Sequence, residues 1–99
     1  MLYDINFRHG FATVGVLIAK KEDRNKGLAK EAFQLVIKYA KEVLDLYNLQ
    51  CFIQADNLAS IHLFEALKFE KIGLRKEWYK FKNSRIDEIS YQLCLKNEI

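Results

Sequence analysis

A single α/β domain with a mixed β-sheet is predicted for residues 1–99, in the element order β-β-α-β-α-β-β. Stretches with the two-residue alternation of strands surround a long stretch with the three- and four-residue spacing of an amphipathic helix. The composition, 51% hydrophobic and 29% charged, is that of a folded rather than a disordered chain. No proline, repeat or low-complexity tract interrupts the sequence, so nothing marks a linker between two domains.

The first two elements are expected to form a β-hairpin. Residues 2–7 alternate apolar and polar side chains, as in a strand with one buried face. Arg8, His9 and Gly10 follow as a turn, in which the glycine can take a positive φ. Residues 12–19 then form a β-branched, nearly all-apolar run, which is typical of a strand covered on both faces.

A long amphipathic helix is expected next, and it is the clearest periodic segment of the chain. Its apolar stripe recurs at steps of three and four through Leu28, Ala32, Leu35, Tyr39, Val43 and Leu46, with Ala29, Phe33, Val36 and Ala40 beside them. Such a stripe predicts the face that packs on the sheet. The helix is expected to end near Tyr47 and Asn48, since asparagine tolerates the left-handed conformation that stops a helix.

The remaining elements are a short central strand over residues 49–55, a second helix and two long strands. Asp56 and Asn57 offer caps for the second helix, because their side chains can accept backbone N–H groups at its start. Strands over 69–81 and 86–95 are expected around a turn at 82–85.

Several classes of function are disfavoured by what the sequence lacks. No apolar run approaches the roughly 20 residues that span a bilayer, and no basic-then-apolar leader opens the chain, so a cytoplasmic protein without a membrane segment is expected. Cys51 and Cys94 lie in apolar stretches and are expected to be free thiols. No C-x-x-C or H-x-x-x-H pair is present, so no metal site is predicted.

A cluster of cations precedes the long helix on a chain whose net charge is only +3. The five cations from residue 20 to residue 30 are Lys20, Lys21, Arg24, Lys26 and Lys30. They leave a nucleic-acid-binding domain open as one alternative. That alternative is disfavoured because such a domain typically has a pI well above 9, so no nucleic-acid partner is predicted.

The segment R-N-K-G-L-A at residues 24–29 is a candidate phosphate site. A helix N-terminus carries unpaired N–H groups and partial positive charge, and Gly27 would let a pyrophosphate approach the backbone closely. The alternative is that Gly27 only permits a tight corner between strand and helix. Both the Walker pattern and G-x-G-x-x-G are absent, which disfavours nucleotide hydrolysis and dinucleotide binding.

Two motifs in register resemble the GNAT superfamily of acetyl-CoA-dependent N-acyltransferases. R-N-K-G-L-A resembles its [Q/R]-x-x-G-x-[G/A] pyrophosphate loop, and N-L-A-S-I-H-L-F-E-A-L-K-F at 57–69 resembles its N-x-x-[AS]-x-x-[LI]-[YF]-x-x-x-[GK]-F signature. The likeness runs from about Tyr3 to Leu95 and is closest to the branch that acetylates ribosomal-protein amino termini and polyamines.

The resemblance implies that acetyl-CoA is the cosubstrate and that its pantetheine arm lies in a V-shaped gap between two strands. Main-chain groups around Leu17 and Ile18 would hold the pantetheine and acetyl groups, and N–H groups from residue 26 to residue 29 would hold the pyrophosphate. The residues implied in cofactor binding are Leu17, Ile18, Arg24, Lys26, Gly27, Leu28, Ala29, Lys30, Asn57 and Phe64. The implied reaction is direct attack of a primary amine of a peptide amino terminus, a polyamine or an amino sugar on the thioester.

Three departures from the family pattern qualify that reading. Phe64 stands where many relatives have a tyrosine that protonates the leaving thiolate, and Thr13 stands where others have a glutamate base, so the catalytic residues stay unknown. Relatives also have a strand, helices and further strands before the part that matches. The N-terminal part of the fold is therefore expected to be missing.

Two consequences of these departures remain as expectations. The first strand would form an open sheet edge, which favours pairing with a second copy, so a homodimer is predicted. The alternative to an active enzyme is a non-catalytic remnant that binds acyl-CoA or a protein partner. Trp78, Tyr79 and Phe81 are candidates for an acceptor pocket, although aromatic residues in strands more often form core or cross-strand pairs.

Overall fold

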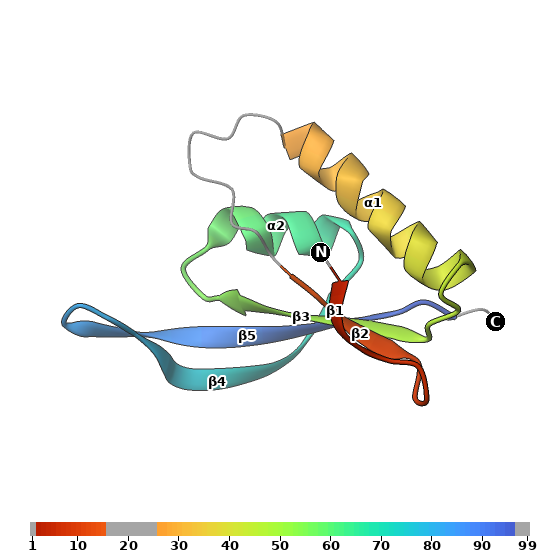
Figure 1. Cartoon of the computed structure of the whole chain (residues 1–99). Helices are drawn as coiled ribbons and strands as arrows, with labels where there is room; N and C mark the ends of the chain where they lie inside the picture. Colours follow the sequence, from red (N-terminus) through yellow and green to blue (C-terminus); the bar gives the residue numbers. More distant parts are fainter. Residues whose placement is uncertain (1, 16–25, 97–99) are drawn as a thin grey trace.

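The computed structural model describes residues 2–15 and 26–96, and it has the predicted element order (Figure 1). The elements are β1 (Leu2–Asn6), β2 (Phe11–Val14), α1 (Lys26–Glu42), β3 (Asn48–Gln54), α2 (Leu58–Ala66), β4 (Glu70–Phe81) and β5 (Ser84–Cys94). The prediction of a mixed sheet with two helices in the order β-β-α-β-α-β-β is confirmed. The second half of the strand predicted over 12–19 lies outside the described residues.

The strands form one sheet in the order β1-β2-β3-β5-β4, and both helices lie over the same face of it (Figure 1). β2 runs parallel to β3, whereas β1 with β2, β3 with β5 and β4 with β5 are antiparallel. The predicted hairpin of the first two strands is confirmed. β1 and β4 are therefore the edges of the described sheet.

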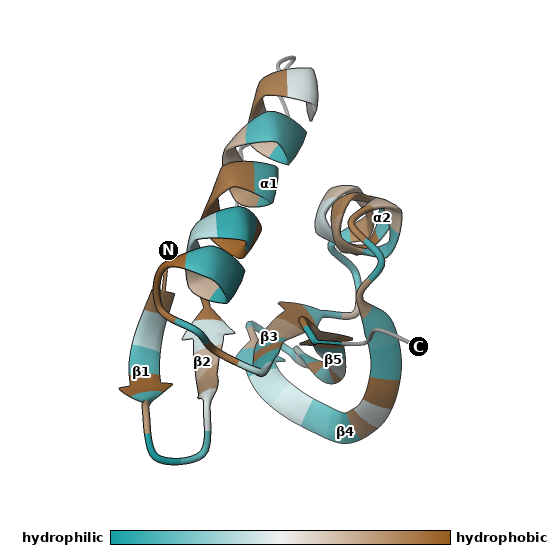
Figure 2. Ribbon diagram, turned by 90° about the vertical axis from the view of Figure 1, so that its right-hand side faces the viewer, coloured by the Kyte–Doolittle hydropathy of each residue, from teal (hydrophilic) through white to brown (hydrophobic). Residues whose placement is uncertain are grey.

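The core lies between the helices and the sheet, and the fully buried ring of Phe64 on α2 is at its centre. The ring meets Phe33 of α1 and Phe69, just before β4, edge-on, with both centroids 5.1 Å away. Because the three rings come from three separate segments, they join both helices to the start of the long hairpin. Figure 2 shows α1 and α2 side by side above the sheet.

Only one side of the predicted apolar stripe of α1 packs inward. Leu28, Leu35, Tyr39 and Val43 of the predicted stripe are 62%, 68%, 52% and 62% exposed, while Phe33 and Ala40 are buried. Apolar side chains cover two adjacent rows of this helix, so periodicity locates the apolar arc without saying which row meets the sheet. The contact of Phe33 with Phe64 of α2 decides the rotation.

The predicted end of α1 near Tyr47 and Asn48 is wrong. The helix ends at Glu42, and Asp45, rather than the asparagine, has the left-handed φ of 56°. The backbone N–H groups of Tyr47 and Asn48 both donate to the carbonyl oxygen of Gly10, at 2.6 and 2.9 Å. Because these donors serve the β1–β2 turn, the chain must leave the helix several residues earlier.

The rotation of α1 can be tested by comparing two truncations. Phe33→Ala should lower the free energy of unfolding by about 3 kcal/mol or more, because it opens a cavity in the aromatic cluster. Leu35→Ala, which shortens a side chain that is 68% exposed, should change it by less than about 0.5 kcal/mol. Urea unfolding monitored by circular dichroism measures both. Equal losses would show that the two rows of α1 are buried alike.

Candidate functional site

A gap opens in the sheet because β2 and β3 stay paired for only three residues. The parallel ladder joins Phe11 with Asn48, Ala12 with Leu49 and Thr13 with Gln50, and it stops there. Within the described ranges 2–15 and 26–96, β3 continues to Gln54 in a ladder with β5 only. The described parts of the two strands are therefore unpaired after the Thr13–Gln50 pair, at the place where the resemblance predicts a V-shaped gap.

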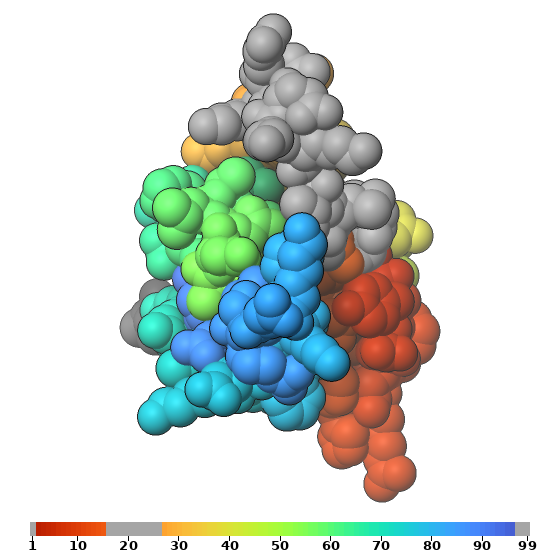
Figure 3. Space-filling view, turned by 90° about the vertical axis from the view of Figure 1, so that its left-hand side faces the viewer, coloured from red at the N-terminus to blue at the C-terminus, as the bar shows by residue number. Residues whose placement is uncertain are grey.

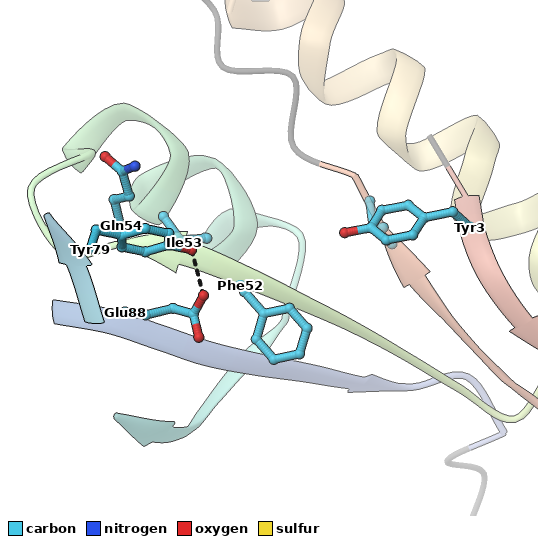
Figure 4. A pocket seen from close by; sticks show the side chains of 7 residues that line it. Tyr3, Phe52, Ile53, Gln54, Tyr79 and Glu88 are labelled. Atoms are coloured by element: carbon cyan, nitrogen blue, oxygen red, sulfur yellow. Dashed lines mark hydrogen bonds between the residues drawn. The ribbon is translucent and has the colours of Figure 1, made fainter. Parts of the chain in front are cut away.

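A cavity of about 300 Å³ lies at this gap. Tyr3 of β1 and Val14 of β2 line one side of it, and side chains of β3, β4 and β5 line the other: Phe52, Ile53, Gln54, Tyr79 and Glu88. Figure 4 shows Tyr3 across the gap from the other labelled residues. Figure 3 views the molecule from the side of the β4–β5 hairpin, which stands in the foreground, with the β1–β2 hairpin to its right in the picture.

The only acidic residue in the cavity wall described here is Glu88 of β5, which is 4% exposed. Its Oε2 accepts a hydrogen bond from the Tyr79 hydroxyl (Figure 4). Its Oε1 has no hydrogen-bond partner, and the nearest cation is Arg75, whose Nη1 is 3.4 Å away. A buried carboxylate oxygen without a donor is costly, so this atom has capacity for a further partner.

Arg75 also lies against two aromatic rings. Its guanidinium carbon lies 4.7 Å from the ring centre of Trp78 and 5.5 Å from that of Phe52, which are cation–π distances. The Arg75 side chain is 49% exposed. It therefore balances part of the Glu88 charge from the solvent side without filling the acceptor capacity of Oε1.

A β-bulge in β4 brings Tyr79 to Glu88. Arg75 pairs with Glu88 and Tyr79 pairs with Ile86, so four steps along β4 span only two along β5. Within the bulge, Glu77 has a positive φ of 51°, and its backbone N–H donates to Oδ1 of Asp87 at 2.7 Å. Tyr79 then stands diagonally opposite Glu88 on one face, within reach of a long side chain.

The phenol of Tyr79 is a stable donor at neutral pH. Burial, together with its hydrogen bond to Glu88 and the charge of that carboxylate, raises the pKa of Tyr79 to about 12. Removing its proton would place two negative charges side by side in a poorly solvated site. The hydroxyl consequently holds Glu88 in place rather than acting as a base.

The first turn of α1 contains most of the predicted cofactor residues that can be placed. Leu17, Ile18 and Arg24 lie outside the described residues, as does the side chain of Lys26, although Lys26 opens the helix. Gly27, Leu28, Ala29 and Lys30 follow in the first turns, and no acidic residue offsets the positive end of the helix there. Their contact with a cofactor stays a prediction.

Gly27 has open space around it among the residues that the structure describes. A Cβ built there would meet none of them within 4 Å, and its φ lies outside the left-handed range. Alanine would favour the helix by about 1 kcal/mol over glycine. The corner before Gly27 lies outside the described residues, so the tight corner and the close approach of a ligand both stay predictions.

Asn57 and Phe64 have structural roles in α2. Asn57 is its N-cap, accepting the Ser60 backbone N–H on Oδ1 at 3.2 Å, and the predicted cap is confirmed. Phe64 is fully buried between two aromatic rings, and it does not line the cavity. Nothing described here tests the cofactor contacts predicted for either residue.

The sequence patterns do not identify most of the residues that line the cavity. Among the three candidates for an acceptor pocket, Tyr79 lines the cavity, whereas Trp78 and Phe81 are 52% and 59% exposed and do not. Glu88 appears as an ordinary polar residue in an alternating strand. Only the bulge, which has no proline or glycine to mark it, places it beside Tyr79.

Thr13 has its hydroxyl oxygen engaged within the sheet. It is 2% exposed, and its Oγ1 accepts a hydrogen bond from Nε2 of Gln50 at 3.0 Å. Among the described residues, no cluster of three His, Cys, Asp or Glu side chains has the arrangement of a metal site. None of the described helices is long and apolar enough to cross a membrane.

The sequence matches a known protein family and several of its members. Residues 1–70 match the family model of the acetyltransferase (GNAT) domain. An uncharacterized N-acetyltransferase p20 of Bacillus licheniformis is 33% identical over 94 residues, which are 95% of this chain and 52% of the relative. Spermidine N(1)-acetyltransferase of Escherichia coli K12 is 35% identical over 72 residues, or 73% of this chain and 38% of that enzyme.

The fold is similar to that of solved spermidine N-acetyltransferase structures. Spermidine N-acetyltransferase from Vibrio cholerae in complex with CoA and spermine aligns with a TM-score of 0.83 at 23% identity, over 95% of this chain and 55% of that one. A dodecameric structure of the Vibrio cholerae enzyme aligns with a TM-score of 0.82. The chain thus spans about half the length of these relatives or less.

The position of Tyr79 beside Glu88 predicts a late alkaline titration. The pKa values of Tyr79 and Tyr91 are both raised to about 12, above the usual 10, so their contribution to stability is complete below pH 10 and is lost as pH rises through about 12. Ultraviolet titration of the folded chain should show this late tyrosinate component, and Tyr79→Phe and Tyr91→Phe should each reduce it. An unchanged late component in Tyr79→Phe would contradict the placement of that phenol.

Proposed function

This chain belongs to the GNAT acetyltransferase family, and on that premise we propose that it binds acetyl-CoA and transfers the acetyl group to a primary amine. The observation that carries the proposal is the parting of β2 from β3, with a cavity at the gap. Two reactants can meet in such a gap, because a thioester entering between the strands would reach an amine held by the cavity wall.

The cofactor is proposed to bind at the residues that the sequence predicts for it. The first N–H groups of α1, at Lys26, Gly27, Leu28 and Ala29, would receive the pyrophosphate, with charge added by Arg24 and Lys30. The open space at Gly27 and the lack of an acidic side chain in that turn support this assignment. Main-chain groups around Leu17 and Ile18 would hold the pantetheine and acetyl groups.

The pantetheine arm of the cofactor is proposed to contact the N-terminal end of α2. Asn57 uses Oδ1 for its cap, which leaves the amide NH₂ group of that side chain as a donor for the pantetheine arm. Phe64, fully buried behind it, would support the wall of this site through packing with Phe33 and Phe69. These assignments rest on the family pattern, residue by residue.

The proposed reaction is a direct transfer without a covalent enzyme intermediate. The neutral amine nitrogen attacks the thioester carbonyl carbon, a C–N bond forms, and the C–S bond of the tetrahedral intermediate breaks. The amine loses a proton and the CoA thiolate leaves. Phe64 has no hydroxyl to protonate that thiolate, and CoA thiolate is a tolerable leaving group without help, so water is the proposed proton source.

The acceptor is proposed to be a small alkyl amine of the polyamine kind. One relative is named a spermidine acetyltransferase, and one aligned structure contains spermine. In this chain the cavity wall combines a buried carboxylate with the aromatic rings of Tyr3, Phe52 and Tyr79, groups that suit an alkylammonium ion. A peptide amino terminus and an amino sugar are the other acceptor classes to be compared.

A second candidate function is a non-catalytic module that binds acyl-CoA. The buried, hydroxyl-free Phe64 and the engaged Thr13 leave two usual catalytic positions of the family without acid or base. Retained affinity for acetyl-CoA without transfer to any amine would support this candidate.

The chain is also proposed to act in the cytoplasm and to form a homodimer. Cys51 and Cys94 are both free, as is usual in a reducing compartment. β1 is a sheet edge in which Ile5 is 39% exposed, and Phe7, in the turn after it, is 67% exposed. The bulge between Tyr3 and Asn6 limits backbone pairing there, so side-chain contact would supply much of the interface.

Cofactor binding is tested by calorimetric titration with acetyl-CoA, with ATP as a comparison. We expect micromolar binding of acetyl-CoA, no comparable binding of ATP, and a loss of at least about tenfold in Gly27→Glu, which places a negative charge against the pyrophosphate. Gln34→Glu, which adds the same charge on an exposed part of α1, should bind normally.

The design separates binding from folding. Glutamate in a first helical turn stabilises a helix, so a loss of affinity in Gly27→Glu is not a loss of structure. No binding of acetyl-CoA by the folded wild-type chain would refute the proposed function.

Self-association is tested by sedimentation equilibrium. The wild-type chain should sediment as a dimer, and Ile5→Lys should shift it to monomer, because a lysine on an edge strand opposes pairing. Leu35→Lys, on the exposed row of α1, is the control and should remain dimeric. A wild-type monomer at tens of micromolar would count against the dimer.

A further inference from the structure

We propose that Glu88 is the catalytic residue that binds the ammonium group of the acceptor and takes its proton. This inference rests on the proposed function, and it assigns to β5 a role that the sequence pattern left unassigned. It is carried by four features of the described residues: a buried oxygen without a donor, a fixed carboxylate, an aromatic surround and the absence of another base in the cavity.

The first feature is the unmet acceptor capacity of Glu88. The residue is 4% exposed, it lines the cavity, and its Oε1 has no hydrogen-bond partner. Nη1 of Arg75 lies 3.4 Å from this oxygen, which is a charge contact without a hydrogen bond. An ammonium group in the cavity would supply the missing donors and complete the balance of charge.

The second feature is that the carboxylate is held in one orientation. Tyr79 donates to Oε2, so Oε1 is the oxygen left for a substrate. The bulge that delivers Tyr79 includes a non-glycine residue, Glu77, with a positive φ. Strained backbone of this kind persists only where the surrounding structure maintains it, and it gathers at functional sites.

The third feature is the set of aromatic rings around the carboxylate. Phe52 and the ring of Tyr79 lie on its own side of the cavity, and Tyr3 faces it across the gap (Figure 4). Aromatic faces attract alkylammonium ions and leave uncharged amines without an advantage. The cavity therefore favours a primary alkylammonium acceptor, which must lose a proton before it can react.

The fourth feature is that no other lining group can serve as the base. The remaining lining residues of the described chain are Tyr3, Val14, Phe52, Ile53, Gln54 and Tyr79. Only the two phenols among them ionise, and Tyr79 is committed as a donor to Glu88. His9 and His62 are both exposed and do not line the cavity.

The proton and the electrons can be followed through the step. The ammonium nitrogen gives one proton to Oε1, forming a carboxylic acid, and keeps the electron pair of the broken N–H bond. That pair forms the new C–N bond with the carbonyl carbon of acetyl-CoA. After the attack the nitrogen still carries one proton too many, and it loses that proton to water as the tetrahedral intermediate collapses to the amide and the C–S bond breaks. The thiolate receives a proton from water, and the carboxylic acid returns its proton to water.

The test compares Glu88→Gln with Glu70→Gln, which removes the same charge from an exposed position on β4. Spermidine is the probe, with acetyl-CoA for turnover and desulfo-CoA for binding by calorimetry. Glu88→Gln should weaken spermidine binding by about tenfold and lower kcat by about 10² or more, the usual size of a lost general base. Its affinity for acetyl-CoA should stay within twofold of wild type.

Tyr79→Phe is the second variant, because it keeps the charge of Glu88 and removes only the hydrogen bond that orients it. It should lower kcat by about three- to tenfold and leave the affinity for acetyl-CoA unchanged. Glu70→Gln should match wild type in every measurement. If Glu88→Gln does not fold, Glu88→Asp replaces it, since the shorter side chain keeps the charge but withdraws it from the substrate.

The two proposals fail in different ways. A wild-type chain that does not bind acetyl-CoA would refute the proposed function. A chain that binds acetyl-CoA but not spermidine, or a Glu88→Gln variant within twofold of wild type in both spermidine binding and kcat, would overturn the role of Glu88. Loss of spermidine binding in Glu88→Gln supports that role even in a chain without turnover.

Discussion

The three-residue length of the parallel ladder between β2 and β3 is the constraint on which the rest of the site depends. Past the Thr13–Gln50 pair, β3 keeps its ladder with β5, while the described end of β2 stays paired with β1 through Val14 and Leu2. Facing edges that are not paired with each other leave N–H and C=O groups that need other partners. Under the proposed function these groups would face the cofactor, so the break that opens the cavity would also leave donors for a ligand.

The long β4–β5 hairpin supplies the polar wall of that opening. Its bulge places Tyr79 beside Glu88, while Arg75 stays at the solvent side between Trp78 and Phe52. The Glu88 carboxylate, which is 4% exposed, is held by one hydrogen bond from Tyr79 and by one ion-pair contact with Arg75 at 3.4 Å. Burial of that kind is expensive in isolation, which is why it points to a partner for the carboxylate rather than to a contribution to stability.

The core explains why a chain of this size holds the gap open. Phe64 links α1, α2 and the entry to β4 through two edge-on ring contacts, so both helices are fixed over the same face of the sheet. The consequence is an exposed row of large apolar side chains on α1.

The sequence by itself determined the element order, the hairpin, the cap at Asn57 and the family, because each depends on local periodicity or on a motif within a few residues. Only the tertiary structure decided which row of α1 is buried, where that helix ends and how Glu88 meets Tyr79. The rotation of α1 is set by a ring on α2, its end by a carbonyl group at Gly10, and the carboxylate pair by a two-residue shift between strands. Each of these depends on contacts between segments distant in the sequence, which local patterns do not record.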